Sequence, residues 1–215
     1  MKKTQIYRLL KILLIIAMII VGWLLYDKLP AIIPIHRNAQ GVVDGYGSKL
    51  TTLIWLPIAA IVLVVLFYFL PKLDPRKQNY PAFATAWEVL QLIILWFFTY
   101  IYFISLYMAM HPSIAIMPWI LWWIGVLFFV LGWAMRHVKS NYFIGIRTPW
   151  ALENEVVRDK THKVGSLTFI LGWIVMFANA FWSAYFLPVF VVVMILCIGI
   201  PVVYSYVVYK RLKLK

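Results

Sequence analysis

Six long apolar runs leave this 215-residue chain few ways to fold. Each run is close to the about 20 residues that an α-helix needs to cross the hydrocarbon core of a bilayer. A segment in lipid must satisfy its own backbone hydrogen bonds, and a helix does so within the segment. The runs therefore predict an all-α, polytopic membrane protein. The six predicted transmembrane helices cover residues 8–26, 51–70, 87–109, 118–136, 164–186 and 188–209.

The composition agrees with this class of protein. Apolar residues make up 65% of the chain, charged residues make up 13%, and the mean hydropathy is +0.90. A soluble domain is closer to half apolar and a quarter charged. The net charge of +13 would suit a nucleic-acid partner, but the charges lie between the apolar runs, as the positive-inside rule predicts. We expect contact with membrane lipids and no direct contact with nucleic acid.

The distribution of Lys and Arg predicts the orientation. If both termini share one side, that side holds 17 of the 20 basic residues, and the other side holds only Lys28, Arg37 and Lys49. Because Lys and Arg are enriched in cytoplasmic loops, this bias predicts that both termini are cytoplasmic. Residues 27–50 then form an outer loop, and residues 137–163 form an inner loop between spans 4 and 5.

The outer loop is rich in residues that favour turns. Prolines stiffen the exit from the first span, and glycines supply positive φ angles. The loop is either a docking surface for an external ligand or an ordered connector, and the spacing alone favours the connector, since most loops carry no function. Its notable residues are Pro30, Pro34, His36, Asn38, Gly41, Asp44 and Gly45.

The inner loop contains the most informative segment, Asn-Tyr-Phe-Ile-Gly-Ile-Arg-Thr-Pro-Trp at residues 141–150. Thr148 suits a helix N-cap, Pro149 suits the first helical position, and Gly145 supplies a left-handed or flexible point before them. These features predict a short helix over about 149–161 at the membrane surface. Trp150 is an aromatic side chain of the type that anchors at the interface.

Glu155, Arg158 and His162 share one side of that predicted helix. They form either an acid–base or metal constellation or a solvated face with a helical ion pair. We favour the solvated face, because an exposed turn lacks the burial that tunes a catalytic pKa and a metal site needs more ligands. Arg147 either contacts an anion or partner, or pairs with lipid phosphate or Glu155. Both interpretations of Arg147 stay open.

Two segments resemble known bacterial membrane families. The inner-loop residues resemble the signature of the SdpI family, and Thr161-His162 and Gly165 resemble its continuation; Ala151, Arg158 and Ser166 depart from it. The matching signature residues are Asn141, Gly145, Ile146, Arg147, Thr148, Pro149, Trp150 and Leu152. The outer-loop residues, together with Leu29, resemble the small domain of unknown function (DUF1648-like) that often precedes an SdpI-type region. The resemblance implies an N-terminal region at 1–75 and an SdpI-like region at 85–215.

Members of the SdpI family protect a bacterium from a secreted peptide toxin. The resemblance therefore implies a multi-pass protein of the bacterial cell membrane that gives immunity to a peptide toxin or bacteriocin. It also implies a signalling role, in which a cytoplasmic transcriptional repressor is captured at the membrane. The implied toxin- or partner-binding residues are the signature residues together with Glu155 and His162. We expect no enzymatic activity and no cofactor.

Two alternatives belong to other functional classes. A small-molecule transporter or permease needs ionisable or polar residues inside the membrane, and the predicted spans have few. A membrane-embedded enzyme would use Glu155, Arg158 and His162, although none of the common hydrolase, P-loop or dinucleotide motifs is present in the sequence. The single cysteine, Cys197, allows no intramolecular disulfide and indicates no metal cluster.

Overall fold

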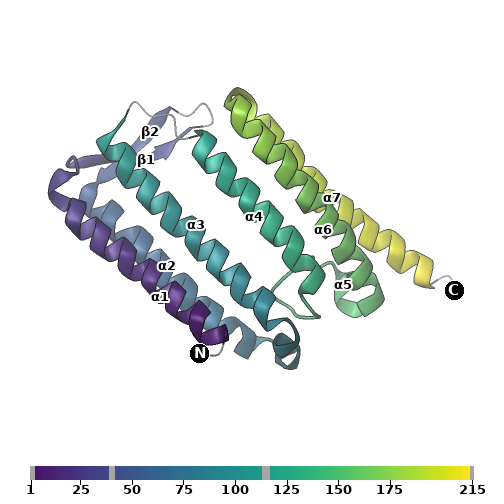
Figure 1. Ribbon diagram of the computed structural model, residues 1–215. Helices are drawn as coiled ribbons and strands as arrows, with labels where there is room; N and C mark the ends of the chain where they lie inside the picture. Colours follow the sequence, from purple (N-terminus) through teal and green to yellow (C-terminus); the bar gives the residue numbers. More distant parts are fainter. Residues whose placement is uncertain (1–2, 39–41, 113–116, 214–215) are drawn as a thin grey trace. The chain divides into compact units, whose positions relative to one another are not determined.

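The computed structural model describes residues 3–38, 42–112 and 117–213 (Figure 1). Within them, six helices are long and apolar enough to cross a membrane, which confirms the predicted all-α polytopic fold. These helices are α1 (Lys3–Leu25), α2 (Lys49–Leu73), α3 (Ala84–Met110), α4 (Met117–His137), α6 (Glu155–Asn179) and α7 (Phe186–Lys213). The shorter helical elements are η1 (Tyr26–Lys28), η2 (Lys77–Phe83), α5 (Pro149–Glu153) and η3 (Ala180–Tyr185).

Large apolar side chains point outward from the long helices. Trp23 near the end of α1 and Trp55 near the start of α2 are 77% and 65% exposed. Such exposure would be unfavourable in water, but lipid is an apolar solvent, and Trp is favoured where the hydrocarbon meets the headgroups. The outward faces therefore match a bilayer.

The outer loop folds as an antiparallel β-hairpin, which the sequence analysis did not predict. Strand β1 (Ile32–Arg37) pairs with β2 (Val43–Ser48), and the register shifts next to His36. The β-branched residues of this segment favour strands, and this preference outweighs the turn signals around it. Ile33 is fully buried in the apolar cluster that contains Met18 and Tyr102, so one face of β1 is fixed by packing. Gly41 lies outside the described residues.

The chain forms two compact units. The first comprises Met1–Tyr68 and Gln91–Ile120, and the second comprises Phe69–Leu90 and Leu121–Lys215, so α3 contributes to both. The predicted regions 1–75 and 85–215 concern sequence families rather than packing, and they stay a prediction.

The first unit contains a buried basic side chain within the first predicted span, 8–26. Lys11 of α1 is only 5% exposed, and its Nζ donates a hydrogen bond of 2.7 Å to Oε1 of Gln91 on α3. A charged group inside a membrane bundle is costly unless a polar group faces it, and the amide of Gln91 does so. The expectation that basic residues flank the spans is wrong at this position.

In the second unit, α6 packs along α7 and α4 at close range (Figure 1). Glycines permit this approach: a Cβ at Gly172 would lie 2.8 Å from Cys197 Sγ, and one at Gly132 would lie 2.9 Å from the Ser166 carbonyl oxygen. The turn between the last two spans lies at η3, before the point where the predicted spans 164–186 and 188–209 adjoin. Pro188 falls in the first turn of α7, where a missing N–H leaves no hydrogen bond unmade.

We expect Gly132→Ala to destabilise the second unit by about 1–3 kcal/mol, because the new methyl group would press against the backbone of Ser166 and Ile170 as well as the Ile170 side chain. The measurement is the thermal unfolding midpoint of the protein in detergent. Gly199→Ala is the matched control, since a Cβ there meets nothing within 4 Å. Equal midpoints for the two variants would contradict the close helix packing.

Candidate functional site

Asn141 organises the irregular segment between α4 and α5. The side chain is fully buried, and its Oδ1 accepts hydrogen bonds from the backbone N–H groups of Phe143 (2.9 Å) and Ile144 (2.6 Å). Its Nδ2 donates to the carbonyl oxygen of Lys139 at 2.8 Å. One amide side chain therefore imitates a backbone turn and fixes the conformation of the segment.

Gly145 and His162, 17 residues apart, are in direct contact. Gly145 has φ +97°, and a Cβ there would lie 2.5 Å from Cε1 of His162. The backbone N–H of Ile146 donates to Nε2 of His162, and the carbonyl oxygen of Met135 lies near Nδ1, both at 3.2 Å. Because an N–H only donates and a carbonyl only accepts, the imidazole is neutral with its proton on Nδ1. His162 thus joins α4, the loop and α6.

The predicted helix over 149–161 is divided at Asn154: α5 ends at Glu153, and residues 155–161 begin α6. Thr148 caps α5 as expected, with Oγ1 accepting from Ala151 N at 3.2 Å and Pro149 in the first position. Asn154 then breaks the helix, because its extended backbone ends α5 and its Oδ1 caps α6 through Val156 N (2.8 Å) and Val157 N (3.1 Å). Asn is a strong N-cap residue, so Asn154 is itself a local signal for a new helix start.

The break changes the environment of three predicted site residues. Glu155, Arg158 and His162 lie in the first turns of a membrane-spanning helix rather than on a surface helix. Glu155 is exposed, whereas Arg158 and His162 are buried, so the predicted solvated face is wrong. Across the described residues no hydrogen bond or ion pair joins any two of the three. The structure does not bring them together as an acid–base group.

Arg158 stabilises the loop backbone instead. It is 2% exposed, and its Nη2 donates to the carbonyl oxygen of Lys139 at 2.8 Å. Nη1 lies 3.5 Å from the carbonyl oxygen of Asn141. A guanidinium is a suitable donor here because its fork of N–H groups reaches two carbonyls at once.

Asp74, which the sequence analysis did not single out, binds the same loop from the other side. Its buried carboxylate accepts from Arg76 N (2.7 Å), from the Tyr80 hydroxyl (3.0 Å) and from Tyr142 N (2.9 Å). The Asp-Pro-Arg sequence at the end of span 2 is a turn signal that could have indicated the local bond to Arg76. Nothing local could have indicated the contact with Tyr142, 68 residues away.

Arg76 and Asn79 complete this polar clamp, which we define as Asp74, Arg76, Asn79, Ser140 and Tyr142. Arg76 donates from Nη1 to Ser140 Oγ and from Nη2 to the Leu152 carbonyl oxygen at 3.0 Å. Its guanidinium lies 4.8 Å from the ring centroid of Tyr142. Asn79 Nδ2 donates to the Ser140 carbonyl oxygen at 2.8 Å. The segment after α2 therefore holds both ends of the inner loop.

Arg147 points outward from this scaffold. It is exposed, and its Nη1 donates to the carbonyl oxygen of Tyr142 at 3.0 Å. Within the described ranges it makes no ion pair, so the suggested pairing with Glu155 is not found. Trp150 packs against α7, with its ring 5.1 Å from Tyr206 and 6.4 Å from Tyr209.

A cavity of about 670 Å³ lies beside Arg147. It is partly open, and its walls are mainly apolar side chains from α4, α6 and α7. Five signature residues line it: Gly145, Ile146, Arg147, Thr148 and Leu152. The signature thus divides between residues that hold the loop and residues that form a cavity wall.

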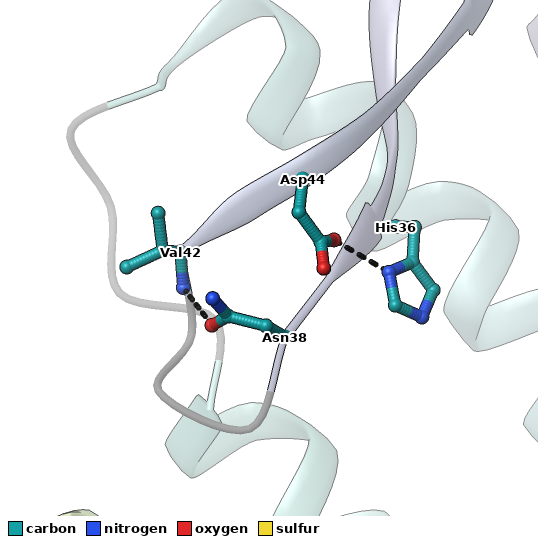
Figure 2. A network of polar contacts seen from close by, with 4 residues as sticks. All are labelled: His36, Asn38, Val42 and Asp44. Carbon is teal, nitrogen blue, oxygen red and sulfur yellow. Dashed lines mark hydrogen bonds and ion pairs between the residues drawn. The ribbon is translucent and has the colours of Figure 1, made fainter.

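The hairpin brings three of the outer-loop residues together, as Figure 2 shows. His36 Nδ1 lies 2.5 Å from Asp44 Oδ1, and both side chains are exposed. Asn38 Oδ1 accepts from Val42 N at 3.0 Å. Gly45 is paired with His36, where a Cβ would lie 2.8 Å from the histidine Cβ. Pro34 lies opposite Tyr46, while Pro30 precedes β1 and joins none of these contacts.

No group of three or more His, Cys, Asp or Glu side chains that could hold a metal is found in the described part of the chain. The His36–Asp44 pair alone offers too few ligands for a closed site.

We expect Asp74→Ala to lower stability by about 3 kcal/mol or more, because it leaves two backbone N–H groups and a buried hydroxyl without an acceptor. Thermal unfolding in detergent measures the effect. Asp159→Ala is the control, since Asp159 is exposed and its loss should change stability by no more than about 0.5 kcal/mol. A small effect at Asp74 would show that the polar clamp does not hold the loop.

Comparison with known proteins finds similarity to two families and to one curated relative. Residues 137–205 match the SdpI/YfhL protein family, and residues 13–61 match DUF1648, a domain of unknown function. The chain is 23% identical over 205 residues to the "Immunity protein SdpI" of Bacillus subtilis (strain 168). The matched residues make up 95% of this chain and 96% of that protein. No solved structure matches the chain significantly. The predicted resemblance is thereby confirmed: this is a multi-pass cell-membrane protein with one segment similar to DUF1648 and a later segment similar to the SdpI/YfhL protein family.

Proposed function

We propose that this protein is an integral membrane immunity protein that protects its cell from a secreted, membrane-active peptide toxin or bacteriocin. One observation carries the proposal: the similarity to an immunity protein extends over 95% of the chain. The signature residues and the outer-loop residues are the proposed contact sites.

The outer hairpin is the proposed toxin-facing element. Its tip carries the exposed His36–Asp44 pair, and Ile32, Ile35 and Tyr46 expose apolar surface of 64%, 56% and 63%. A two-stranded hairpin also has unpaired strand edges, which can pair with an extended peptide through backbone hydrogen bonds. These properties suit a ligand that is itself a short amphipathic peptide.

The inner loop is the proposed partner-facing element. The polar clamp fixes its backbone, and exposed basic side chains surround it, so the loop offers a rigid and mainly positive surface. This surface includes Arg136, Lys139, Arg147, Lys163, Lys210 and Arg211. In the proposal, both termini and this loop are cytoplasmic, and the surface captures a transcriptional repressor.

The orientation makes a direct prediction. Tyr46→Cys in the hairpin should react with a membrane-impermeant maleimide on intact cells, whereas Lys160→Cys should react only after the cells are broken. Both positions are exposed, and native Cys197 is 2% exposed, so the unsubstituted protein serves as the blank. Labelling of Lys160→Cys on intact cells would reverse the proposed topology.

The immunity function is tested in a toxin-sensitive bacterium challenged with candidate peptides. Expression of the protein should raise the tolerated peptide concentration, and Arg147→Ala should reduce that gain at unchanged membrane abundance. Loss of one charge-assisted contact weakens binding by about tenfold or more, and tolerance should fall to a similar extent. Lys160→Ala, an exposed basic residue outside the signature, is the matched control and should protect fully. Full protection by Arg147→Ala at equal abundance would remove Arg147 from the site.

A further inference from the structure

The cavity beside Arg147 is lined by membrane-spanning helices and by the loop between α4 and α5. Its apolar walls come from Leu131 and Ala134 of α4, Phe169 of α6, and Ile198 and Val202 of α7. Its volume of about 670 Å³ is within the range of about 300–1,000 Å³ that is usual for ligand sites. An apolar, partly open space of this size beside membrane-spanning helices suits a hydrocarbon chain.

One end of the cavity is cationic. Arg147 lines it and is exposed. Among the described residues, its side chain makes one hydrogen bond, from Nη1 to the Tyr142 carbonyl oxygen, and this bond orients the remaining guanidinium N–H groups. No carboxylate is among the residues that line the cavity in the described part of the chain. A guanidinium binds phosphate oxygens through parallel N–H donors, which makes this end complementary to a phosphate.

The depth of Arg147 favours a lipid over a soluble anion. Trp150, three residues further along, packs against Tyr206 and Tyr209 near the end of α7. Trp and Tyr gather at the level of the headgroups, so Arg147 lies where phospholipid phosphates lie. Nearby basic residues such as Lys139 and Lys163 are exposed and add a positive field that selects negative headgroups.

We propose that this cavity binds one anionic phospholipid, with the phosphate at the Arg147 guanidinium and an acyl chain along the apolar walls. The lipid site shares Arg147 with the proposed immunity function, but its ligand is a component of the membrane, so the two proposals can be tested separately. The lipid would complete the wall that the signature residues leave open.

The test uses purified, delipidated full-length protein in detergent, without any toxin. Phosphatidylglycerol should raise the thermal midpoint more than phosphatidylcholine with the same chains, and native mass spectrometry should show one retained phosphatidylglycerol. Glycerol phosphate, which has the headgroup charge but no chain, should give no shift. Equal shifts from the two lipids, or an equal shift from glycerol phosphate, would overturn the proposal.

Two variants locate the site. Arg147→Gln should weaken phosphatidylglycerol binding by about tenfold or more and remove the preference over phosphatidylcholine. Ile198→Trp should fill the cavity and reduce binding of both lipids. The controls are Lys160→Gln and Ile195→Trp; Ile195 lies on the same helix, is 63% exposed and does not line the cavity.

The outcomes separate this proposal from immunity. Retention of lipid and of the headgroup preference by Arg147→Gln overturns the lipid site, whatever the variant does in the toxin assay. A variant that fails to fold is recognised by its elution profile in detergent, and Arg147→Lys then takes its place. Lys keeps the positive charge but lacks the parallel N–H donors of the guanidinium, so the preference of Arg147→Lys for phosphatidylglycerol over phosphatidylcholine should be intermediate. A preference equal to that of the unsubstituted protein again overturns the site.

Discussion

An irregular backbone held against membrane-spanning helices needs a hydrogen-bond partner for each buried polar group, since lipid supplies none. In the second unit this need is met by side chains. Asn141 bonds the loop to itself, Arg158 and His162 reach it from α6, and Asp74 reaches it from the segment after α2. Without these bonds the segment before α5 would have no stable conformation at this depth.

This arrangement gives the signature a physical meaning. Gly145 is needed because its φ is positive and because His162 occupies the space of a Cβ. Thr148 and Pro149 start α5 in a fixed direction. With the backbone fixed, Arg147 is held at the mouth of an apolar cavity and its guanidinium stays exposed. The same few residues therefore stabilise the loop and create a surface suited to an anionic amphiphile.

Parts of the site could be predicted from the sequence and parts could not. The cap at Thr148 and the special backbone at Gly145 are local properties, and both predictions are confirmed. The break at Asn154 was also local, but a helical periodicity over 149–161 outweighed a single cap residue. The burial of Arg158 and His162 could not be predicted. Their expected exposure depended on one surface helix over 149–161, whereas both residues belong to the membrane-spanning helix α6.

Hydrophobic length and the need for internal backbone hydrogen bonds act within each segment, so the sequence alone determined the class of the protein and the number of its spans. Which polar groups meet was decided only by the tertiary structure. Lys11 with Gln91, Asp74 with Tyr142 and His36 with Asp44 are pairs of this kind. Each pair depends on how separate helices or strands are brought together, and no periodicity within one segment carries that information.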